Sequence, residues 1–142
     1  MLNFEKFKAV GMMAARNARE KAKQEGVSAN EVISMTVLLK PWKEGPQTAG
    51  EVVAYNGAPY KVVQAHDSTG NPDWNPEKAP ALFAPYHATV KEYALPYVAP
   101  TGAHDAYMKG EWAIYEGKLY ECQQDATVHD PVTLPGAWKL AE

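Results

Sequence analysis

The chain has 142 residues, a formal net charge of −3, and a single cysteine among 11 prolines and 10 glycines. Its scattered Lys and Arg form no basic stripe, so the composition argues against a nucleic-acid partner. One cysteine excludes an intramolecular disulfide and any zinc site built from several cysteines.

The sequence gives no sign of a membrane or export signal. No apolar run approaches the roughly 18 residues that a membrane-spanning helix needs, so we expect no membrane partner. The first residues mix both charges, with Glu5 beside Lys6 and Lys8, instead of placing an apolar stretch after a basic one. We therefore expect a soluble protein made without a secretory signal peptide.

Residues 3–25 are the strongest helix prediction. Apolar side chains recur at helical spacing from Phe4 through Phe7 and Val10, and charged side chains cover the other side. Gly26 stands where a glycine commonly ends a helix. The apolar stripe must be buried either on this chain or against its copies in an oligomer.

A second, shorter helix follows. Ser28 and Glu31 form the capping-box pattern, which predicts a helix over 29–35. The chain is then expected to extend over 37–39 toward a proline. Residues 1–40 are therefore predicted to form a helical segment for assembly or docking.

The rest of the chain repeats one pattern at a spacing of sixty residues. The stretch Gly-Glu-Val-Val-Ala-Tyr-Asn-Gly-Ala-Pro-Tyr at 50–60 returns as Gly-Glu-Trp-Ala-Ile-Tyr-Glu-Gly-Lys-Leu-Tyr at 110–120. Self-similarity at a fixed offset indicates a duplicated structural unit. We therefore expect two copies of one small β unit behind the helices.

Each copy is predicted to contain a β-hairpin. In the first copy, alternating runs at 51–55 and 59–65 flank Asn-Gly at 56–57, which is a strong hairpin signal. The second copy has Glu-Gly at 116–117 instead and keeps the glycine for positive φ. Both hairpins are thus expected to share one turn geometry.

A Pro-rich stretch that ends in an aromatic residue follows each hairpin, at 74–83 and at 131–138. Residues 90–98 are a candidate edge strand, because Pro96 argues against a central one. The predicted class is α+β, with N-terminal helices followed by two small antiparallel β modules. The predicted divisions are the helical segment 1–40, the first module 41–87, the linker 88–102 and the second module 103–142.

The repeated residues resemble carbohydrate-binding module families 5 and 12, the chitin- and cellulose-binding modules appended to bacterial chitinases and cellulases. That family's pattern runs Tyr-x-x-Gly-Asp-x-Val-x-Tyr-x-Gly-x-x-Tyr, then a Pro-containing stretch and a closing Trp. The second copy matches with Tyr107, Gly110, Glu111, Ala113, Tyr115, Gly117, Tyr120 and Trp138. The first matches with Gly50, Glu51, Val53, Tyr55, Gly57 and Tyr60, with Phe83 at the close and Gln47 in place of the leading Tyr.

The whole architecture also resembles small tail-associated proteins of phages and prophages of Gram-positive bacteria. In these proteins a helical N-terminus leads into Pro-Trp-Lys-x-Gly and one or more such modules, and the similar stretches here are 41–45 and 64–76. The resemblance implies a virion structural protein that is assembled in the bacterial cytoplasm. Its expected partners are copies of itself, in a homo-oligomer, and other virion proteins.

The modules imply an alternative function, a glycan-binding adhesin that recognises a host cell-wall or surface polysaccharide. Sugar rings stack on exposed aromatic faces, and the candidate carbohydrate-binding residues are Trp74, Trp42 and Trp112. Cellulose-binding relatives carry adjacent aromatics just after the return-strand tyrosine. No such pair stands at 61–65 or 121–125, so the fold can be present without the binding.

Two of the tryptophans leave alternatives open. Trp112 lies on the strand face opposite Tyr115, where it is either exposed or packed on a neighbouring segment such as the N-terminal helix. Trp74 lies in a polar, Pro-flanked loop, where it either offers a sugar platform or closes the core of its own module. The hairpin tyrosines are expected to be core residues.

Three His-Asp pairs stand at 66–67, 104–105 and 129–130. Sequential neighbours on an extended chain point to opposite faces, so each pair is a poor chelate and is expected to cap turns or lie in solvated loops. Nothing marks a nucleophile or a second carboxylate, so we predict no catalytic residue, metal or cofactor, and no enzyme. Cys122 aligns with Val62 and is expected to be buried.

Overall fold

The computed structural model describes residues 4–141, and for residues 4–12 it describes the backbone alone. Within that part the chain is a small mixed protein with few helices and several small sheets, in line with the α+β class. The helices are α1 (Phe4–Ala22), α2 (Ala29–Ser34), and the short 3-10 helices η1 (Thr36–Leu38), η2 (Lys91–Tyr93) and η3 (Pro135–Ala137). None of these helices is both long enough and apolar enough to cross a membrane.

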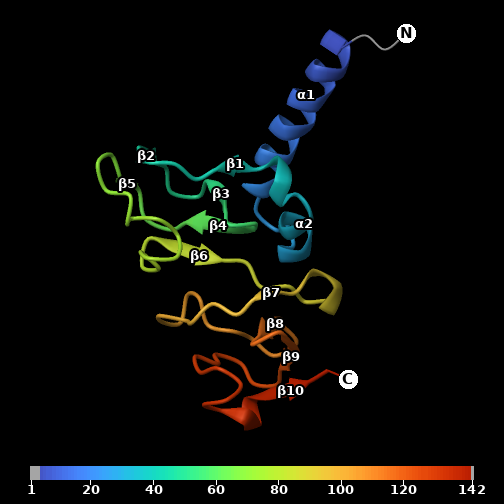
Figure 1. Cartoon of the computed structure of the whole chain (residues 1–142), viewed down its shortest axis with the longest axis vertical. Coiled ribbons are helices and arrows are strands. Elements are labelled where there is room, and N and C mark those ends of the chain that lie inside the picture. Colours follow the sequence, from blue (N-terminus) through green and yellow to red (C-terminus); the bar gives the residue numbers. More distant parts are fainter. Residues whose placement is uncertain (1–3, 142) are drawn as a thin grey trace.

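α1 projects from the rest of the molecule and meets it at its C-terminal end (Figure 1). It is shorter than the predicted 3–25, and residue 3 lies outside the described residues. The side chains of Phe4, Phe7 and Val10 also lie outside the described part, so their predicted apolar stripe is not tested. Further along the helix, Ala18 and Ala22 are buried, which shows that this end docks on its own chain.

The capping signal at Ser28 is confirmed, because its hydroxyl accepts the Glu31 amide hydrogen at 3.2 Å. α2 ends at Ser34, one residue before the predicted end. The prediction of an extended stretch over 37–39 is wrong for its first two residues. There the Leu38 amide donates to the Met35 carbonyl at 2.8 Å, which closes the 3-10 turn of η1.

Two four-stranded sheets and one two-stranded ribbon follow the helices. In sheet order, the first sheet contains β1 (Lys40–Pro41), β3 (Val52–Tyr55), β4 (Ala58–Val62) and β6 (Phe83–Pro85). The second contains β7 (Leu95–Pro96), β8 (Trp112–Tyr115), β9 (Lys118–Cys122) and β10 (Trp138–Leu140). The ribbon pairs β2 (Pro46–Gln47) with β5 (His66–Asp67).

The two sheets have the same strand order and the same register. Val53 lies opposite Tyr60 in the first hairpin, and Ala113 lies opposite Tyr120 in the second. The turn residue Asn56 has φ 48° and its counterpart Glu116 has φ 51°, each followed by a glycine at positive φ. Two left-handed residues in a row are the hallmark of the type I′ turn that Asn-Gly predicts.

Each four-stranded sheet is mixed, because its edge strand pairs in parallel: β1 with β3, and β7 with β8. The modules are therefore not wholly antiparallel, contrary to the prediction, because one edge strand of each sheet is parallel to its neighbour. Pairing continues past both edge strands, with the Trp42 amide donating to Ala54 at 2.8 Å and the Tyr97 amide to Ile114 at 2.7 Å. Leu95 and Pro96 are thus an edge strand of the second sheet, within the predicted candidate edge strand 90–98.

The apolar side chains form three clusters. The inward faces of the two sheets supply one cluster each, around Phe83 and Trp138 respectively. The third lies on the outward face of the first sheet, where Ala22, Val32 and Leu39 cover Val52. The N-terminal helices therefore act as a lid over one face of the first sheet.

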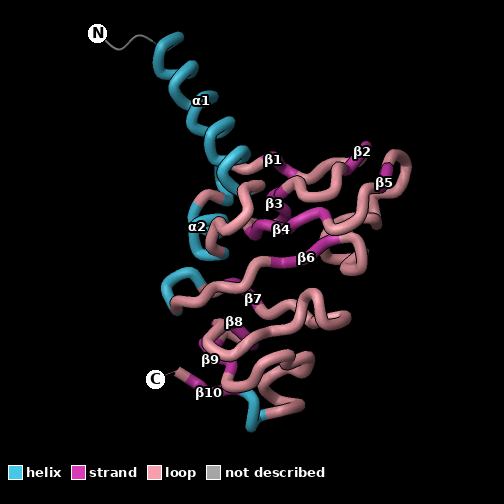
Figure 2. Tube along the Cα trace, turned by 180° about the vertical axis from the view of Figure 1, so that it is seen from behind, coloured by secondary structure: helices cyan, strands magenta, loops and turns pink. Residues whose placement is uncertain are grey.

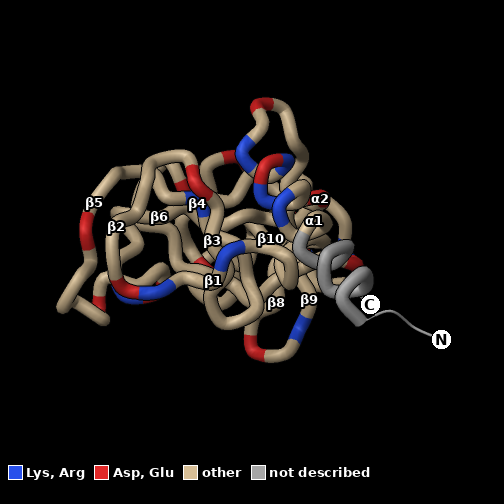
Figure 3. Tube along the Cα trace, turned by 90° about the horizontal axis from the view of Figure 1, so that it is seen from above, with Lys and Arg blue, Asp and Glu red and all other residues tan. Residues whose placement is uncertain are grey.

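The two sheets follow one another along the long axis, with α1 at one end and β10 at the other (Figure 1). The helices α1 and α2 lie along one edge, and long loops of both sheets project at the opposite edge (Figure 2). At the junction, the Trp112 amide donates to the Ala88 carbonyl at 2.9 Å. Lys and Arg are interspersed with Asp and Glu when the described residues are seen along the long axis (Figure 3).

Candidate functional site

Trp74 is the most exposed of the three candidate tryptophans, with 42% of its surface accessible. It lies in the long loop between β5 and β6, and its amide donates to the Asn71 carbonyl at 3.1 Å. Its ring meets the His66 ring at 6.5 Å between centroids, and His66 stands edge-on to Phe83 at 5.5 Å. Since Phe83 is buried in the first core, a row of three rings supports Trp74 from inside while leaving part of it in solvent.

The loop around Trp74 is tied down by its own side chains. The buried Asn75 side chain accepts the amide hydrogens of Glu77 and Lys78 at 3.0 and 2.9 Å and donates to the Pro72 carbonyl at 3.1 Å. Asp67 accepts both the hydroxyl and the amide of Thr69, and these bonds hold the pKa of the Asp67 carboxyl below its usual value. The loop therefore presents Trp74 in a preset conformation.

Trp42 is half-buried and belongs to the edge of the first core. Its ring meets Tyr55 edge-on, with centroids 5.7 Å apart and planes at 88°. The indole N–H is buried and finds no hydrogen-bond acceptor among the described residues. Trp42 thus supports the sheet with one part of its ring and leaves a donor unsatisfied.

Trp112 lies on the outward face of the second sheet, half-buried. It lines a shallow hollow of about 400 Å³ together with Lys91, Glu121, Lys139, Leu140 and Ala141. Of its two alternatives, exposure or packing on a neighbouring segment, the half-buried position fits the second. That segment is not the N-terminal helix, because the cluster under those helices contains Val52 and not Trp112. No ring pair or cavity within residues 13–141 joins any two of the three candidate tryptophans.

A cleft of about 240 Å³ separates the first hairpin from the second sheet. Its aromatic lining comes from both sides of the junction: Tyr60, Tyr86, His87, Tyr97 and Tyr107. Asn56 and Glu77 stand at the same cleft and are joined by a hydrogen bond of 2.8 Å. Sequence reasoning did not find this group, because residues of the two modules meet there. Its prediction of a core position holds for Tyr60, which is 5% exposed and belongs to the core of the first sheet.

His87 is the most constrained polar residue of the cleft. Its ring stacks on Tyr107 with centroids 3.7 Å apart and planes within 8°. Its Nδ1 lies 3.1 Å from Glu111 Oε1, which also accepts the Met108 amide at 2.6 Å. Its Nε2 is buried and has no hydrogen-bond partner in the described part of the chain.

The cleft tyrosines are neutral phenols over the ordinary pH range. Burial, together with the Asp130 and Tyr115 charges, raises the pKa of Tyr97 to about 12. Burial also raises the pKa of Tyr107. The Val98 amide donates to its hydroxyl oxygen at 3.0 Å and lowers this pKa, but by less than burial raises it. These phenols therefore keep their hydroxyl protons at neutral pH.

The turn-capping interpretation of the three His-Asp pairs is confirmed for each aspartate. Asp67 caps Thr69, Asp105 accepts the amides of Thr101 and Gly102 at 2.9 Å, and Asp130 accepts the amides of Val132 and Thr133. Asp105 is buried instead of solvated. Across the described residues, no three His, Cys, Asp or Glu side chains gather in a way that would hold a metal ion.

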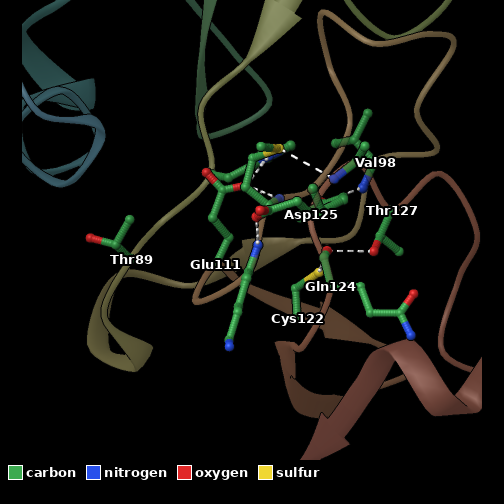
Figure 4. Close-up of polar contacts among 12 residues, drawn as sticks. Thr89, Val98, Glu111, Cys122, Gln124, Asp125 and Thr127 are labelled. Carbon is green, nitrogen blue, oxygen red and sulfur yellow. Dashed lines mark hydrogen bonds and ion pairs between the residues drawn. The ribbon is translucent and has the colours of Figure 1, made fainter.

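Cys122 is buried, as the alignment with Val62 predicted. Its thiol donates to the Gln124 carbonyl at 3.1 Å, and the Thr127 hydroxyl donates to the same oxygen at 2.7 Å (Figure 4). The thiol is therefore part of a local polar contact under the second sheet.

Comparison with known proteins finds one family model that matches part of this chain. Residues 41–84 match the model of carbohydrate-binding module family 5/12. The match runs from β1 into β6, so it spans the first sheet and contains both Trp42 and Trp74. No curated protein matches the chain. The match supports a carbohydrate-binding module in this part of the chain.

Proposed function

We propose that this protein binds a polysaccharide through the exposed side of its first module, with Trp74 as the principal stacking residue. The observation that carries the proposal is that Trp74 lies within the matched residues 41–84 and keeps 42% of its surface accessible. The function is one of binding, without catalysis.

The physical basis is the flat ring. The apolar CH faces of a pyranose stack on indole, and a ring that is already held loses little conformational entropy on binding. His66 and Asn75 supply that support from below and from within the loop. In the same loop, Asp73 and Lys78 form an exposed ion pair of 3.1 Å, which offers an acceptor and a donor to sugar hydroxyls.

Trp42 and Trp112 have different parts in this proposal. Trp42 packs edge-on against Tyr55, so its removal weakens the module before it weakens binding. Trp112 belongs to the second sheet and forms a separate carbohydrate-binding candidate with its own shallow hollow. A polymer that reaches both modules would gain affinity from the two contacts together.

The test is retention on insoluble polysaccharide. We expect the intact chain to be pulled down by at least one of chitin, cellulose or purified peptidoglycan, and the Trp74→Ala variant to be lost from that polymer. Tyr93→Ala is the matched control, because Tyr93 is also 42% accessible but lies on η2, outside the matched residues. Absence of retention on all three polymers would contradict polysaccharide binding for those ligands, and retention of Trp74→Ala at the level of the intact chain would exclude this ring as the platform.

We further propose that the protein is a tail-associated structural component of a phage or prophage virion, with α1 as its assembly element. Two features support this: the resemblance of residues 41–45 and 64–76 to such tail proteins, and the projection of α1 beyond the sheets (Figure 1). The expected partners are copies of this chain in a homo-oligomer and other virion proteins, and the expected location is the virion.

A deletion that tests assembly must keep the residues that cover Val52. Deletion of residues 1–40 would remove Val32 and Leu39 and expose the first sheet, so aggregation would obscure the result. Deletion of residues 1–12 keeps the buried Ala18 and Ala22. We expect light scattering to show an oligomer for the intact chain and monomers after this deletion; a monomeric intact chain would contradict the assembly role. Mass spectrometry of purified particles tests the virion location separately.

A further inference from the structure

We propose that the cleft between the two modules is a second binding site, separate from the Trp74 face, that takes a single neutral pyranose ring whose hydroxyl donates a hydrogen bond to His87 Nε2. This site adds to the polymer binding proposed for the first module and does not depend on it.

Size restricts the ligand. Pockets for drug-sized ligands start at about 300 Å³, whereas this cleft measures about 240 Å³. Its walls are ring-lined on both sides, with Tyr60 and Tyr86 from the first module and Tyr97 and Tyr107 from the second. A space of this size between aromatic walls suits one six-membered ring and not an extended oligosaccharide.

The unsatisfied nitrogen of His87 defines the chemistry. Nδ1 lies 3.1 Å from the Glu111 carboxylate, so we assign the N–H of the neutral ring to Nδ1, and in this tautomer Nε2 is an acceptor. The side chain is only 8% exposed, and Nε2 has no partner among the described residues. Leaving a buried acceptor without a donor is unfavourable. A ligand hydroxyl that reaches Nε2 removes that penalty, whereas a ligand without an O–H or N–H donor does not.

The direction of this acceptor is fixed before a ligand arrives. His87, Tyr107 and Tyr97 form a stack of three nearly parallel rings, with planes within 8° and 11° of each other. The Val98 amide also holds the Tyr107 hydroxyl at 3.0 Å. Fixed donors and acceptors bind without the entropic cost of ordering them.

Charge restricts the ligand further. Glu77 lines the cleft, and Glu111 lies behind His87, but no Lys or Arg is among the lining residues. The Asn56 amide and the Glu77 carboxylate, paired at 2.8 Å, offer one more donor and one more acceptor at the mouth. A neutral polyol therefore fits, whereas a uronic acid or a phosphorylated sugar would meet uncompensated negative charge.

The test is a titration of the full chain, labelled with ¹⁵N, with glucose, N-acetylglucosamine and glucuronate up to about 100 mM, a range that detects millimolar affinity. We expect saturable shifts for at least one neutral sugar at the Val98 and Gly57 amides and at His87 Nε2, and none for glucuronate. The absence of saturable shifts for both neutral sugars would overturn the proposal, as would equal binding of glucuronate or shifts confined to the Trp74 loop.

Variants connect the signal to the cleft. His87→Phe keeps a ring on Tyr107 and removes the acceptor, so affinity should fall about ten-fold or more. Should that variant fail to fold, Asn56→Gly removes the amide at the mouth and is compatible with φ 48°, with Glu116→Gly as the matched control at φ 51° in the other hairpin. We expect Asn56→Gly to weaken binding and Glu116→Gly to leave it unchanged; equal behaviour of the two would contradict the site.

The two binding proposals fail separately. Trp74→Ala should lose retention on polymer and keep the sugar titration at the cleft. His87→Phe should lose the titration and keep retention on polymer.

Discussion

The side chain of Asn30 holds Thr89 through two hydrogen bonds, donating to its hydroxyl at 2.6 Å and accepting its amide hydrogen at 2.9 Å. One residue belongs to α2, and the other lies between the two sheets, directly after Ala88, which pairs with Trp112. This contact therefore joins the helical segment to the start of the second module across 59 positions of sequence.

We expect Asn30→Ala to make the two modules unfold at different urea concentrations. Both hydrogen bonds are lost, and because they are exposed to solvent we expect a cost of about 1 kcal/mol in the free energy of unfolding. Urea titrations followed at an aromatic signal from each module provide the measurement. Ser34→Ala, which removes an exposed bond inside α2 alone, is the control; an equal effect of both variants would show that the Asn30 contact does not join the modules.

Val52 and Trp112 occupy equivalent outward positions at the start of the two hairpins, and we expect exchanging them to cost different amounts of stability. Val52 is 3% exposed under the N-terminal helices, so Val52→Trp overfills that space and should cost roughly 1–3 kcal/mol. Trp112→Val acts on a half-buried site beside solvent and should cost about 1 kcal/mol or less. Denaturant midpoints of the two variants compare these costs, and a larger loss for Trp112→Val would contradict the lid over the first sheet.

Acid should weaken the loop before the second hairpin. Burial by itself would raise the pKa of Asp105, but the amides of Thr101 and Gly102 and the Thr101 hydroxyl outweigh it and the pKa is lowered. The stabilisation is therefore present above the unfolded value near 3.9 and is lost as pH falls through the folded pKa. Asp105→Asn should lose about 1–3 kcal/mol at neutral pH and show less dependence of stability on pH below about 4. Thermal unfolding over that range distinguishes the variant from the parent.

We expect alkaline pH to lower the stability of the folded chain by ionising Tyr97. In the unfolded chain this phenol ionises near pH 10, whereas in the folded chain burial raises its pKa to about 12. The folded state therefore keeps its full stability below pH 10 and loses some as pH rises from 10 to 12. Phenolate absorbance should show late-titrating tyrosines, and Tyr97→Phe should remove one of them while the buried Tyr107 still titrates late. An unchanged late amplitude in that variant would assign the step to other tyrosines.

The hairpins could be predicted because their signals are local. The turn glycines and the alternation around Asn56 determine each hairpin within a dozen residues. The edge strand at Leu95 and Pro96 lies within the predicted candidate 90–98, but its parallel pairing was not predicted, nor was the edge strand at Lys40 and Pro41. Two-residue parallel pairing depends on where the rest of the chain goes. A weaker signal was present: Pro41-Trp42 is repeated as Pro96-Tyr97 at a spacing of fifty-five, not sixty.

The candidate site was predicted only in part. A loop tryptophan between prolines is visible in sequence, so Trp74 could be named as a candidate, and the structure leaves it partly exposed. The cleft around His87 was not predicted, because its two walls come from different copies of the repeat. In addition, the lack of a hydrogen-bond partner for His87 Nε2 can be seen only in the folded chain. Nor does the sequence show why Val52 and Trp112 differ, since the helices cover only one of the two equivalent faces.

The shift in spacing between the two copies has a practical consequence. The segment between β4 and β6 (63–82) is five residues longer than its counterpart (123–137), and the segment between β7 and β8 (97–111) is five residues longer than 42–51. Closing five more residues costs only about 0.3 kcal/mol, while a slip of one residue in a strand would turn every inward side chain outward. The scaffold therefore accepts insertions at two fixed points without a change in pairing, and these two points are where foreign peptides can be grafted to give the protein new specificities.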